Sequence, residues 1–258
     1  MRNLLLKIRY DGSGYHGWAR QKDLRTVCGR LEEVLSAYFK TDIKLEGASR
    51  TDAGVHANGQ CATLIGDVRV PTEKIPAVFN TALADDRIEN LSDIEIISAH
   101  EMPPGFHARF NAKGKRYIYR IRNCEKTDVF LKKYRWQIKP QLDVEAMNEA
   151  CRYIVGEHDF ACFQTSGGIP RETTVRKVFS LEVCRDNAHP EELELRIEGN
   201  GFLYNMVRII TGTLVDVGLS KKAPEDLKYI IESKDRSNAG IIAPAGGLWL
   251  DEVFYQTF

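Results

Sequence analysis

Residues 4–10 read LLLKIRY, and in this stretch apolar side chains alternate with basic ones. A period of two predicts a β-strand with one buried face. Thr26 then stands in the N-cap position of a segment, 27–39, whose apolar residues recur at helical spacing. The chain is therefore predicted to open with a strand followed by a helix.

Further strands and helices are predicted along the rest of the chain. The strands are expected at 60–65, 115–121, 175–183, 192–198 and 248–254, and the helices at 72–83, 143–154, 204–217 and 225–232. Because strands adjoin in several places, the pattern favours split βαβ units on antiparallel or mixed sheets, an α+β fold. Each half has a comparable set of elements, which predicts two similar lobes, 1–105 and 106–258.

Length and composition limit the class of protein. The 258 residues correspond to one or two domains, and 43% hydrophobic with 28% charged residues excludes disordered, collagen-like and coiled-coil chains. The longest stretches without Asp, Glu, Lys or Arg have 14 residues (53–66 and 237–250), too short to span a bilayer. Lys7 interrupts the apolar N-terminus before it reaches the length of a secretory segment. We expect a cytoplasmic protein without membrane contact.

Cysteine and histidine spacing gives no sign of a metal site. The six cysteines form no CxxC pair, and the six histidines lack zinc-ligand spacing with one another or with cysteine. Reduced thiols and no structural metal are the expectation.

The charges balance overall but not locally. With 36 basic and 36 acidic residues, the chain has no global cationic field. Residues 109–135 nevertheless contain ten basic residues against two acidic ones, and residues 1–25 contain six against two. The acidic residues that balance these charges lie at 85–95 and 186–198. The pattern predicts either a polarised molecule with a basic, RNA-binding side or two charge-laced surfaces in solvent.

Residues 12–17 read GSGYHG and match GxGxxG directly after a strand. A dinucleotide site needs the third glycine inside a helix, but 18–23 are mostly polar and helical spacing begins only near Val27. We therefore predict a glycine-rich turn that carries basic and aromatic residues, and no NAD site. The sequence also lacks GxxxxGK[ST], so an ATP-binding P-loop is not expected.

Residues 47–57 read GASRTDAGVHA, in which Arg50 and Asp52 are the only charged side chains. Alternation along an extended segment would place both on one face. A carboxylate in such apolar surroundings must be paired or hydrogen-bonded, because burying it alone is too costly. Asp52 is therefore either a catalytic acid or half of a structural Arg–Asp pair, and the spacing alone favours the pair.

Residues 199–214 read GNGFLYNMVRIITGTL, and Arg208 is the only charge between Glu198 and Asp216. A buried guanidinium needs an anion. Asp52 lies in an equally charge-poor setting, and a pair with Arg208 would keep its carboxylate ionised. The alternative is that Arg208 faces solvent at the margin of the helix.

Two tyrosines, Tyr117 and Tyr119, are threaded through the basic residues Lys115 and Arg116. Aromatic faces on a cationic surface suit an unstacked nucleic-acid base. Packing in the core is the competing explanation, and it must hold for at least one of the two.

Together these segments resemble the tRNA pseudouridine synthase A (TruA) family nearly from end to end. The matching segments are YDGSGYHGWARQ (10–21), TVCGRLEEVL (26–35), GASRTDAGVHANGQ (47–60), FHARFNAKGKRYIYRI (106–121), GEHDFACF (156–163), TVRKV (174–178), GNGFLYNMVRIITGTLVDVG (199–218) and AGIIAPAGGLWLDEV (239–253). The resemblance implies isomerisation of uridine to pseudouridine at position 38, 39 or 40 of the tRNA anticodon stem-loop. It implies no cofactor and no metal, and a homodimer of chains with two ferredoxin-like lobes and a central active-site cleft.

The resemblance also implies roles for single residues. Asp52 matches the essential aspartate of the family, and Arg50 the basic residue two positions before it. Arg208 matches the arginine of the third motif. Tyr117 matches the tyrosine that stacks on the target base, and Leu248 the apolar residue that lines the uracil site.

Basic residues that take no part in the reaction are expected to bind tRNA phosphates, among them Arg20, Lys115 and Arg116. The chain departs from the family pattern at Ser49, where glycine is common, and at Ala19, where glutamine is usual. These departures concern RNA contacts and the modified position more than the chemistry.

Two other functions compete with this one. A non-catalytic RNA-binding protein on the same lobes would need the aromatic and basic residues but not Asp52. A Cys- or His-dependent hydrolase would rest on Cys162 near His158, although no orienting partner supports it.

Overall fold

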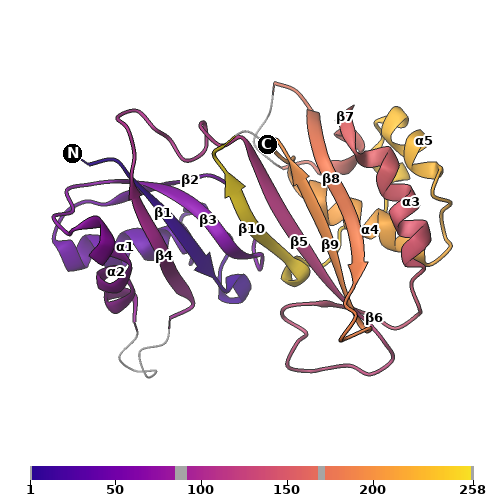
Figure 1. Cartoon of the computed structure of the whole chain (residues 1–258), viewed down its shortest axis with the longest axis horizontal. Helices are drawn as coiled ribbons and strands as arrows, with labels where there is room; N and C mark the ends of the chain where they lie inside the picture. The colour runs from indigo at the N-terminus through magenta and orange to yellow at the C-terminus, as the bar shows by residue number, and fades with distance from the viewer. Residues whose placement is uncertain (1, 85–91, 168–171, 257–258) are drawn as a thin grey trace. The chain divides into compact units, whose positions relative to one another are not determined.

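The computed structural model describes residues 2–84, 92–167 and 172–256 (Figure 1). The chain divides into two compact units, Met1–Lys113 with Leu250–Phe258, and Gly114–Trp249. The first unit thus extends past the predicted boundary at 105/106 and includes the end of the chain.

Up to Lys113 the first unit has the element order βαββαβ, and most of β10 (Leu248–Phe254) also belongs to this unit. Its elements are β1 (Leu4–Tyr10), α1 (Val27–Phe39), β2 (Lys44–Gly47), β3 (His56–Ile65), α2 (Ile75–Leu83) and β4 (Ile94–Glu101). The strands lie in the order β4-β1-β3-β2, every neighbouring pair is antiparallel, and α1 packs against α2 (Figure 1). This is the split βαβ topology of a ferredoxin-like fold, as predicted.

The local signals in the sequence explain how this unit begins. Leu4, Leu6 and Ile8 on β1 are fully buried, and the Thr26 hydroxyl accepts a hydrogen bond from the Gly29 amide at 3.2 Å, which confirms the predicted cap of α1. β1 also buries Leu5 on its other face. β1 is a central strand, paired with β3 on one side and β4 on the other.

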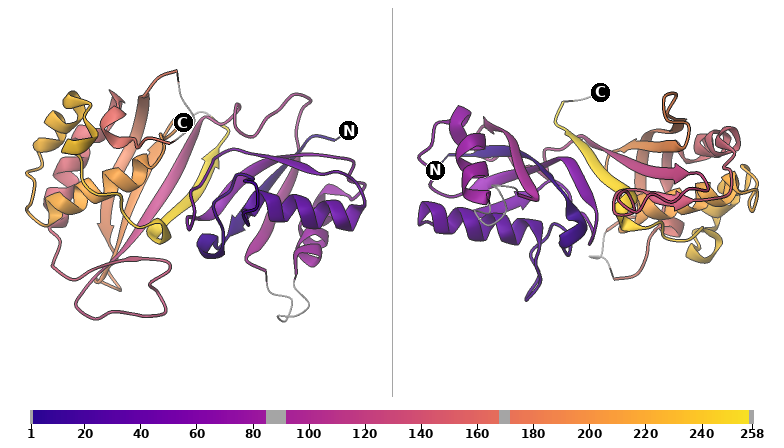
Figure 2. Two further views of the ribbon diagram at one scale, coloured as in Figure 1. Left: turned by 180° about the vertical axis from the view of Figure 1, so that it is seen from behind. Right: turned by 90° about the horizontal axis from the view of Figure 1, so that it is seen from below.

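The second unit is also a mixture of strands and helices. Its elements are β5 (Gly114–Asn123), β6 (Trp136–Ile138), α3 (Val144–Ile154), β7 (Gly156–Asp159), β8 (Val175–Arg185), β9 (Glu192–Gly199), α4 (Met206–Gly218) and α5 (Asp226–Ser233). The strands lie in the antiparallel order β5-β9-β8-β7, and β6 runs parallel to β5. α3 packs against β8, α4 and α5 (Figure 2). The predicted α+β class with mixed sheets is confirmed.

Four short or exposed strands were not predicted: β2, β4, β6 and β7. β3 also begins at His56, before the predicted start at Gln60, and runs through Gly59. A Cβ on Gly59 would lie 2.4 Å from the Asp251 carbonyl oxygen on β10 (Leu248–Phe254). Gly59 is therefore in the strand because a neighbouring backbone passes close to it, and not because the chain turns there.

None of the helices within the described ranges is long and apolar enough to cross a membrane.

Candidate functional site

Asp52 lies on a tight turn between β2 and β3. Its side chain is half-buried, and its carbonyl oxygen accepts a hydrogen bond from the Val55 amide at 3.1 Å. Gly54 has φ +77°, a conformation that favours glycine, so the turn depends on it. We call residues 50–55 the Asp52 loop.

The glycine-rich segment 10–18 packs directly against the Asp52 loop. The Trp18 amide donates to the Thr51 carbonyl at 3.1 Å, and the Gly54 amide donates to the Tyr15 carbonyl at 3.2 Å. A Cβ on Gly12 would lie 2.0 Å from the Val55 carbonyl oxygen. The predicted glycine-rich turn is confirmed, and its glycines let the backbone approach this loop.

The sequence left open a structural pair between Arg50 and Asp52, and this alternative is wrong. Arg50 is exposed, and among the residues that the structure describes it forms no ion pair with Asp52. The alternation that placed both residues on one face does not apply, because β2 ends at Gly47 and the chain is irregular up to His56. Arg50 therefore does not hold the Asp52 carboxylate in place.

Gln60 and His56 bind residues next to the Asp52 loop, and sequence reasoning missed both. Gln60 is fully buried; its Oε1 accepts from the Ser49 amide at 3.2 Å, and its Nε2 donates to the Ser49 carbonyl at 2.8 Å. His56 is also fully buried, and its Nδ1 accepts from the Gly12 amide at 3.1 Å. Only their side-chain chemistry could have indicated this role, because a buried amide or imidazole needs hydrogen-bond partners.

Arg208 lies on the first turns of α4 and is fixed by neutral oxygens. Its Nε donates to the Ala243 carbonyl, and an Nη donates to the Asn205 side-chain oxygen, both at 2.8 Å. The Asn205 amide in turn donates to the Thr165 hydroxyl at 2.8 Å. The half-buried guanidinium is thus held in one orientation instead of extending into solvent.

Both tyrosines of β5 are buried, and Tyr117 is only 6% exposed. Tyr119 is fully buried, and its hydroxyl donates to the Pro244 carbonyl at 2.7 Å, which confirms that one of the pair belongs to the core. Burial raises the pKa of the Tyr119 hydroxyl. The Tyr117 ring meets the edge of Phe202, with centroids 5.3 Å apart and planes at 87°.

Leu248 follows a 3-10 turn that packs on the same part of the core. A Cβ on Gly247 would lie 2.6 Å from the Tyr119 ring, so the residue before Leu248 has no room for a side chain. Leu248 itself is 6% exposed. Arg208, Tyr117 and Leu248 belong to the second unit, whereas Asp52 belongs to the first.

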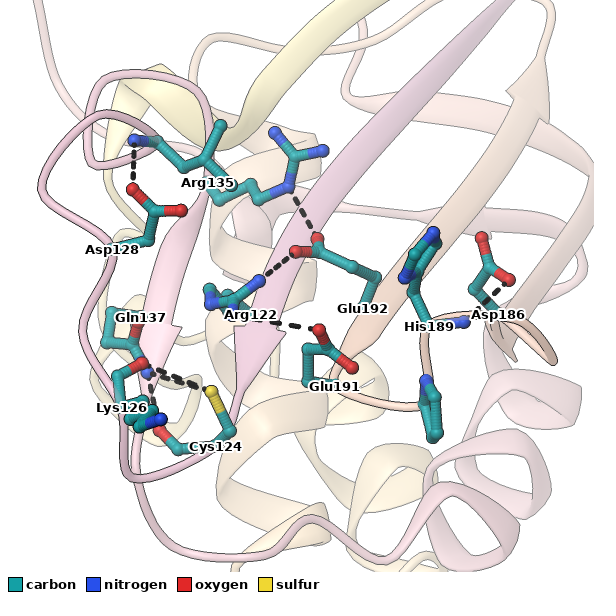
Figure 3. A network of polar contacts seen from close by, with 12 residues as sticks. Arg122, Cys124, Lys126, Asp128, Arg135, Gln137, Asp186, His189, Glu191 and Glu192 are labelled. Atoms are coloured by element: carbon teal, nitrogen blue, oxygen red, sulfur yellow. Dashed lines mark hydrogen bonds and ion pairs between the residues drawn. The ribbon is translucent and has the colours of Figure 1, made fainter.

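Where β5 meets β9, the structure favours the alternative of charge-laced surfaces over a polarised molecule. The antiparallel register places three arginines of β5 directly opposite three glutamates of β9. The pairs are Arg116 with Glu198 (Nε to Oε1, 2.7 Å), Arg120 with Glu194 (3.1 Å) and Arg122 with Glu192 (Nη1 to Oε1, 2.7 Å). Glu192 also accepts from Arg135 at 2.5 Å, so it joins two arginines (Figure 3). The acid at 186–198 therefore neutralises part of the basic stretch directly.

The remaining predicted phosphate ligands differ in how exposed they are. Arg20 pairs with the buried carboxylate of Glu32, although 55% of the Arg20 side chain stays exposed. Lys115 is half-buried, whereas Lys126 and Lys132 are exposed. The exposed lysines are the better candidates for phosphate contacts.

The hydrolase alternative is wrong, because Cys162 is fully buried and its burial raises the thiol pKa to about 12. A thiol in this state supplies almost no thiolate near neutral pH. All six cysteines are free. In the part of the chain that the structure describes, no three His, Cys, Asp or Glu side chains gather where they could hold a metal ion.

Comparison with known proteins agrees with the resemblance seen in the sequence. A family model described as tRNA pseudouridine synthase matches residues 7–111 and 150–256. The chain is 41% identical over 257 residues to tRNA pseudouridine synthase A 2 of Clostridium tetani, covering 99% of both chains. The chain belongs to the tRNA pseudouridine synthase family.

A second relative and one solved structure add to this comparison. Over 257 residues, tRNA pseudouridine synthase A of Ruminiclostridium cellulolyticum is 42% identical, covering 99% of this chain and 100% of that protein. A crystal structure of a Cbf5-Nop10-Gar1 complex aligns with a TM-score of 0.31 and 12% identity, over 82% of this chain and 54% of that one. The ranges matched by the family model include Asp52, Arg208 and Leu248, whereas Tyr117 lies between them.

Proposed function

We propose that this chain isomerises uridine to pseudouridine at position 38, 39 or 40 of the tRNA anticodon stem-loop, without a cofactor. Membership of the family across nearly the whole chain carries this proposal. The same resemblance supports a cytoplasmic homodimer.

The reaction needs little beyond a carboxylate and a fixed nucleoside. The C1′–N1 bond breaks, the uracil turns, C5 bonds to C1′, and the proton on C5 is lost while N1 gains one. No electron or phosphoryl group is transferred. Asp52 supplies the ionised carboxylate that begins this sequence, acting on the sugar or on the base.

The other site residues bind and orient the nucleoside. Arg208, which Ala243 and Asn205 already fix, presents its guanidinium without further ordering. Tyr117 stacks on the uracil, and Leu248 lines the uracil site. Arg50 is exposed near Asp52 and contacts the RNA, instead of pairing with the aspartate.

A uridine in a stem must first leave its base pair. Unstacking costs a few kcal/mol, and stacking on Tyr117 offsets part of that cost. Exposed basic residues, Lys126 and Lys132 among them, bind the phosphates of the tRNA.

Asp52→Asn tests the proposal, because the substitution keeps the shape and removes the carboxylate. Purified protein is incubated with unmodified tRNA, without added metal or nucleotide, and pseudouridine is mapped by carbodiimide-dependent primer extension. The wild type should modify position 38, 39 or 40, and Asp52→Asn should lose about 1,000-fold or more of the rate while it still binds tRNA. Asp42→Asn, at an exposed aspartate of the same unit, is the control.

A non-catalytic RNA-binding protein is the alternative. It predicts that the wild type binds tRNA and forms no pseudouridine. An Asp52→Asn variant with undiminished turnover would instead reject the role of Asp52 while leaving the activity in place.

A further inference from the structure

We propose that Tyr10 and Thr51 are positioning residues, whose paired hydroxyls fix the backbone that carries Asp52. The inference rests on the proposed catalytic role of Asp52. It concerns contacts within the first unit alone.

The two hydroxyls form a buried hydrogen bond. Tyr10 Oη lies 2.7 Å from Thr51 Oγ1, and the two residues are only 3% and 7% exposed. Thr51 immediately precedes Asp52, so this bond holds the peptide that leads into the aspartate. A buried hydroxyl that loses its partner is costly, so the pair strongly favours this one conformation.

Tyr10 is a rigid anchor for this bond. It lies at the end of β1, where it pairs with Ala57 of β3 and with Ile94 of β4. Its ring lies 6.0 Å from the Trp18 ring, centroid to centroid. A residue held by two neighbouring strands and an aromatic contact does not follow movements of a loop. It can therefore restrain the loop.

The backbone on both sides of the Asp52 side chain is fixed as well. The Trp18 amide donates to the Thr51 carbonyl at 3.1 Å, which binds the same residue that Tyr10 holds by its side chain. The Asp52 carbonyl accepts from Val55 at 3.1 Å on the following side. The backbone on either side of the aspartate is thus fixed by hydrogen bonds.

Such restraint matters for the reaction and less for binding. A carboxylate that acts on a nucleoside must approach within near-attack distance, and misplacement by about 1 Å can cost about 100-fold in rate. Apart from Arg50, the exposed basic residues expected to contact tRNA, such as Lys126 and Lys132, lie outside this loop. Loss of the hydroxyl pair should therefore lower kcat and leave KM for tRNA nearly unchanged.

The test compares Tyr10→Phe, Thr51→Val and their double variant with Thr51→Ser. The rate is followed by release of tritium from tRNA whose uridines are labelled at C5, because that hydrogen is lost in the reaction. Either removal should lower kcat by about 10- to 100-fold, and the double variant should be no worse than the poorer single one. Thr51→Ser keeps the hydroxyl and should recover most of kcat.

Tyr255→Phe is the matched control for a purely structural role. Its hydroxyl donates to the Ala108 carbonyl at 2.9 Å in the same unit, so this change also removes one tyrosine hydrogen bond. It should lower thermal stability as Tyr10→Phe does and leave kcat at the wild-type value. Equal kcat for Tyr10→Phe and Tyr255→Phe in folded protein would overturn the positioning role.

The outcomes separate this inference from the proposed function. Full activity of Asp52→Asn would overturn the role of the aspartate and this inference with it. An inactive Asp52→Asn beside fully active Tyr10→Phe and Thr51→Val would overturn only the positioning role.

Discussion

Arg120 on β5 lies opposite Glu194 on β9, with Nε 3.1 Å from Oε1, and its guanidinium carbon lies 4.7 Å from the centre of the Trp249 ring. The arginine is thus held by a carboxylate and an aromatic face at once. Because its charge is already balanced within the protein, Arg120 should contribute little to the binding of a phosphate.

Replacing a paired or an exposed basic residue should therefore change the salt dependence of tRNA binding to different extents. Each phosphate contact that is lost lowers the slope of log K against log salt by about 0.7 to 0.9. We expect Lys132→Gln to lower the slope for tRNA binding by about this amount, and Arg120→Gln to change it little. Binding titrations between about 50 and 200 mM KCl measure both. Equal slopes for the two variants would contradict this division of the basic stretch.

Substitutions of Tyr117 and Tyr119 should distinguish stacking on the uracil base from packing in the protein core. Tyr117→Phe keeps an aromatic face and should retain most activity, whereas Tyr117→Leu should lose about tenfold or more in kcat/KM. Tyr119→Phe should instead lower the free energy of unfolding by about 1 kcal/mol, because it breaks the buried bond to Pro244. Rate assays and thermal unfolding check the two effects. Equal rates for wild type, Tyr117→Phe and Tyr117→Leu would argue against stacking.

Local signals in the sequence predicted the elements well. Alternation gave β1, and the caps Thr26 and Asp143 placed the starts of α1 and α3, where the Asp143 carboxylate accepts from Ala146 at 2.9 Å. These features depend on neighbours along the chain, which the sequence shows directly.

Pairings across the chain could not be predicted in the same way. Whether Arg116 faces Glu198 depends on the register between two distant strands, and a shift by one residue would have moved each arginine to the other face. The false pairing of Arg50 with Asp52 came from assuming a strand between Gly47 and His56, where the structure has none. The hydrogen bonds of Gln60 to Ser49 likewise follow only from the fold.

Alanine substitutions at Gly17 and, as a control, at Gly105 test how closely the glycine-rich segment packs on the Asp52 loop. Both have positive φ, +87° and +83°, so an alanine is strained at either position. A Cβ on Gly17 would lie 2.5 Å from the Thr51 carbonyl oxygen, whereas one on Gly105 would have nothing within 4 Å. We expect Gly17→Ala to cost about 1 to 3 kcal/mol more stability than Gly105→Ala and to lower the rate. Chemical denaturation and the tritium assay check this, and similar costs at both positions would contradict it.

Cys162 should be irrelevant to the reaction. Because burial raises its thiol pKa to about 12, it should resist iodoacetamide in the folded protein near neutral pH. Cys162→Ala should retain the wild-type rate and lose only the stability of a small buried side chain. Mass spectrometry after brief alkylation, with unfolded protein as the control, measures the reactivity. Inactivation that follows alkylation of Cys162 would reopen the hydrolase alternative.

The surroundings of the Asp159 carboxyl predict how the stability of the folded protein changes with pH. The Thr174 hydroxyl, the Lys234 ammonium at 2.9 Å and the Ala161 amide hold the pKa of this carboxyl below its ordinary value. A lowered pKa means that the ionised form stabilises the folded state above the unfolded pKa of about 3.9, and that this contribution is lost as pH falls through the folded value.

Asp159→Asn should therefore lower the free energy of unfolding by about 1 kcal/mol near neutral pH. The difference from wild type should shrink as the pH falls below about 4 and vanish once the wild-type carboxyl is protonated. Urea denaturation across this range measures it, and Asp67→Asn, at an exposed ion pair with Arg69, should change little at any pH. A difference of the same size at neutral and at acid pH would show that the carboxylate charge contributes nothing and that only the shape of the side chain matters.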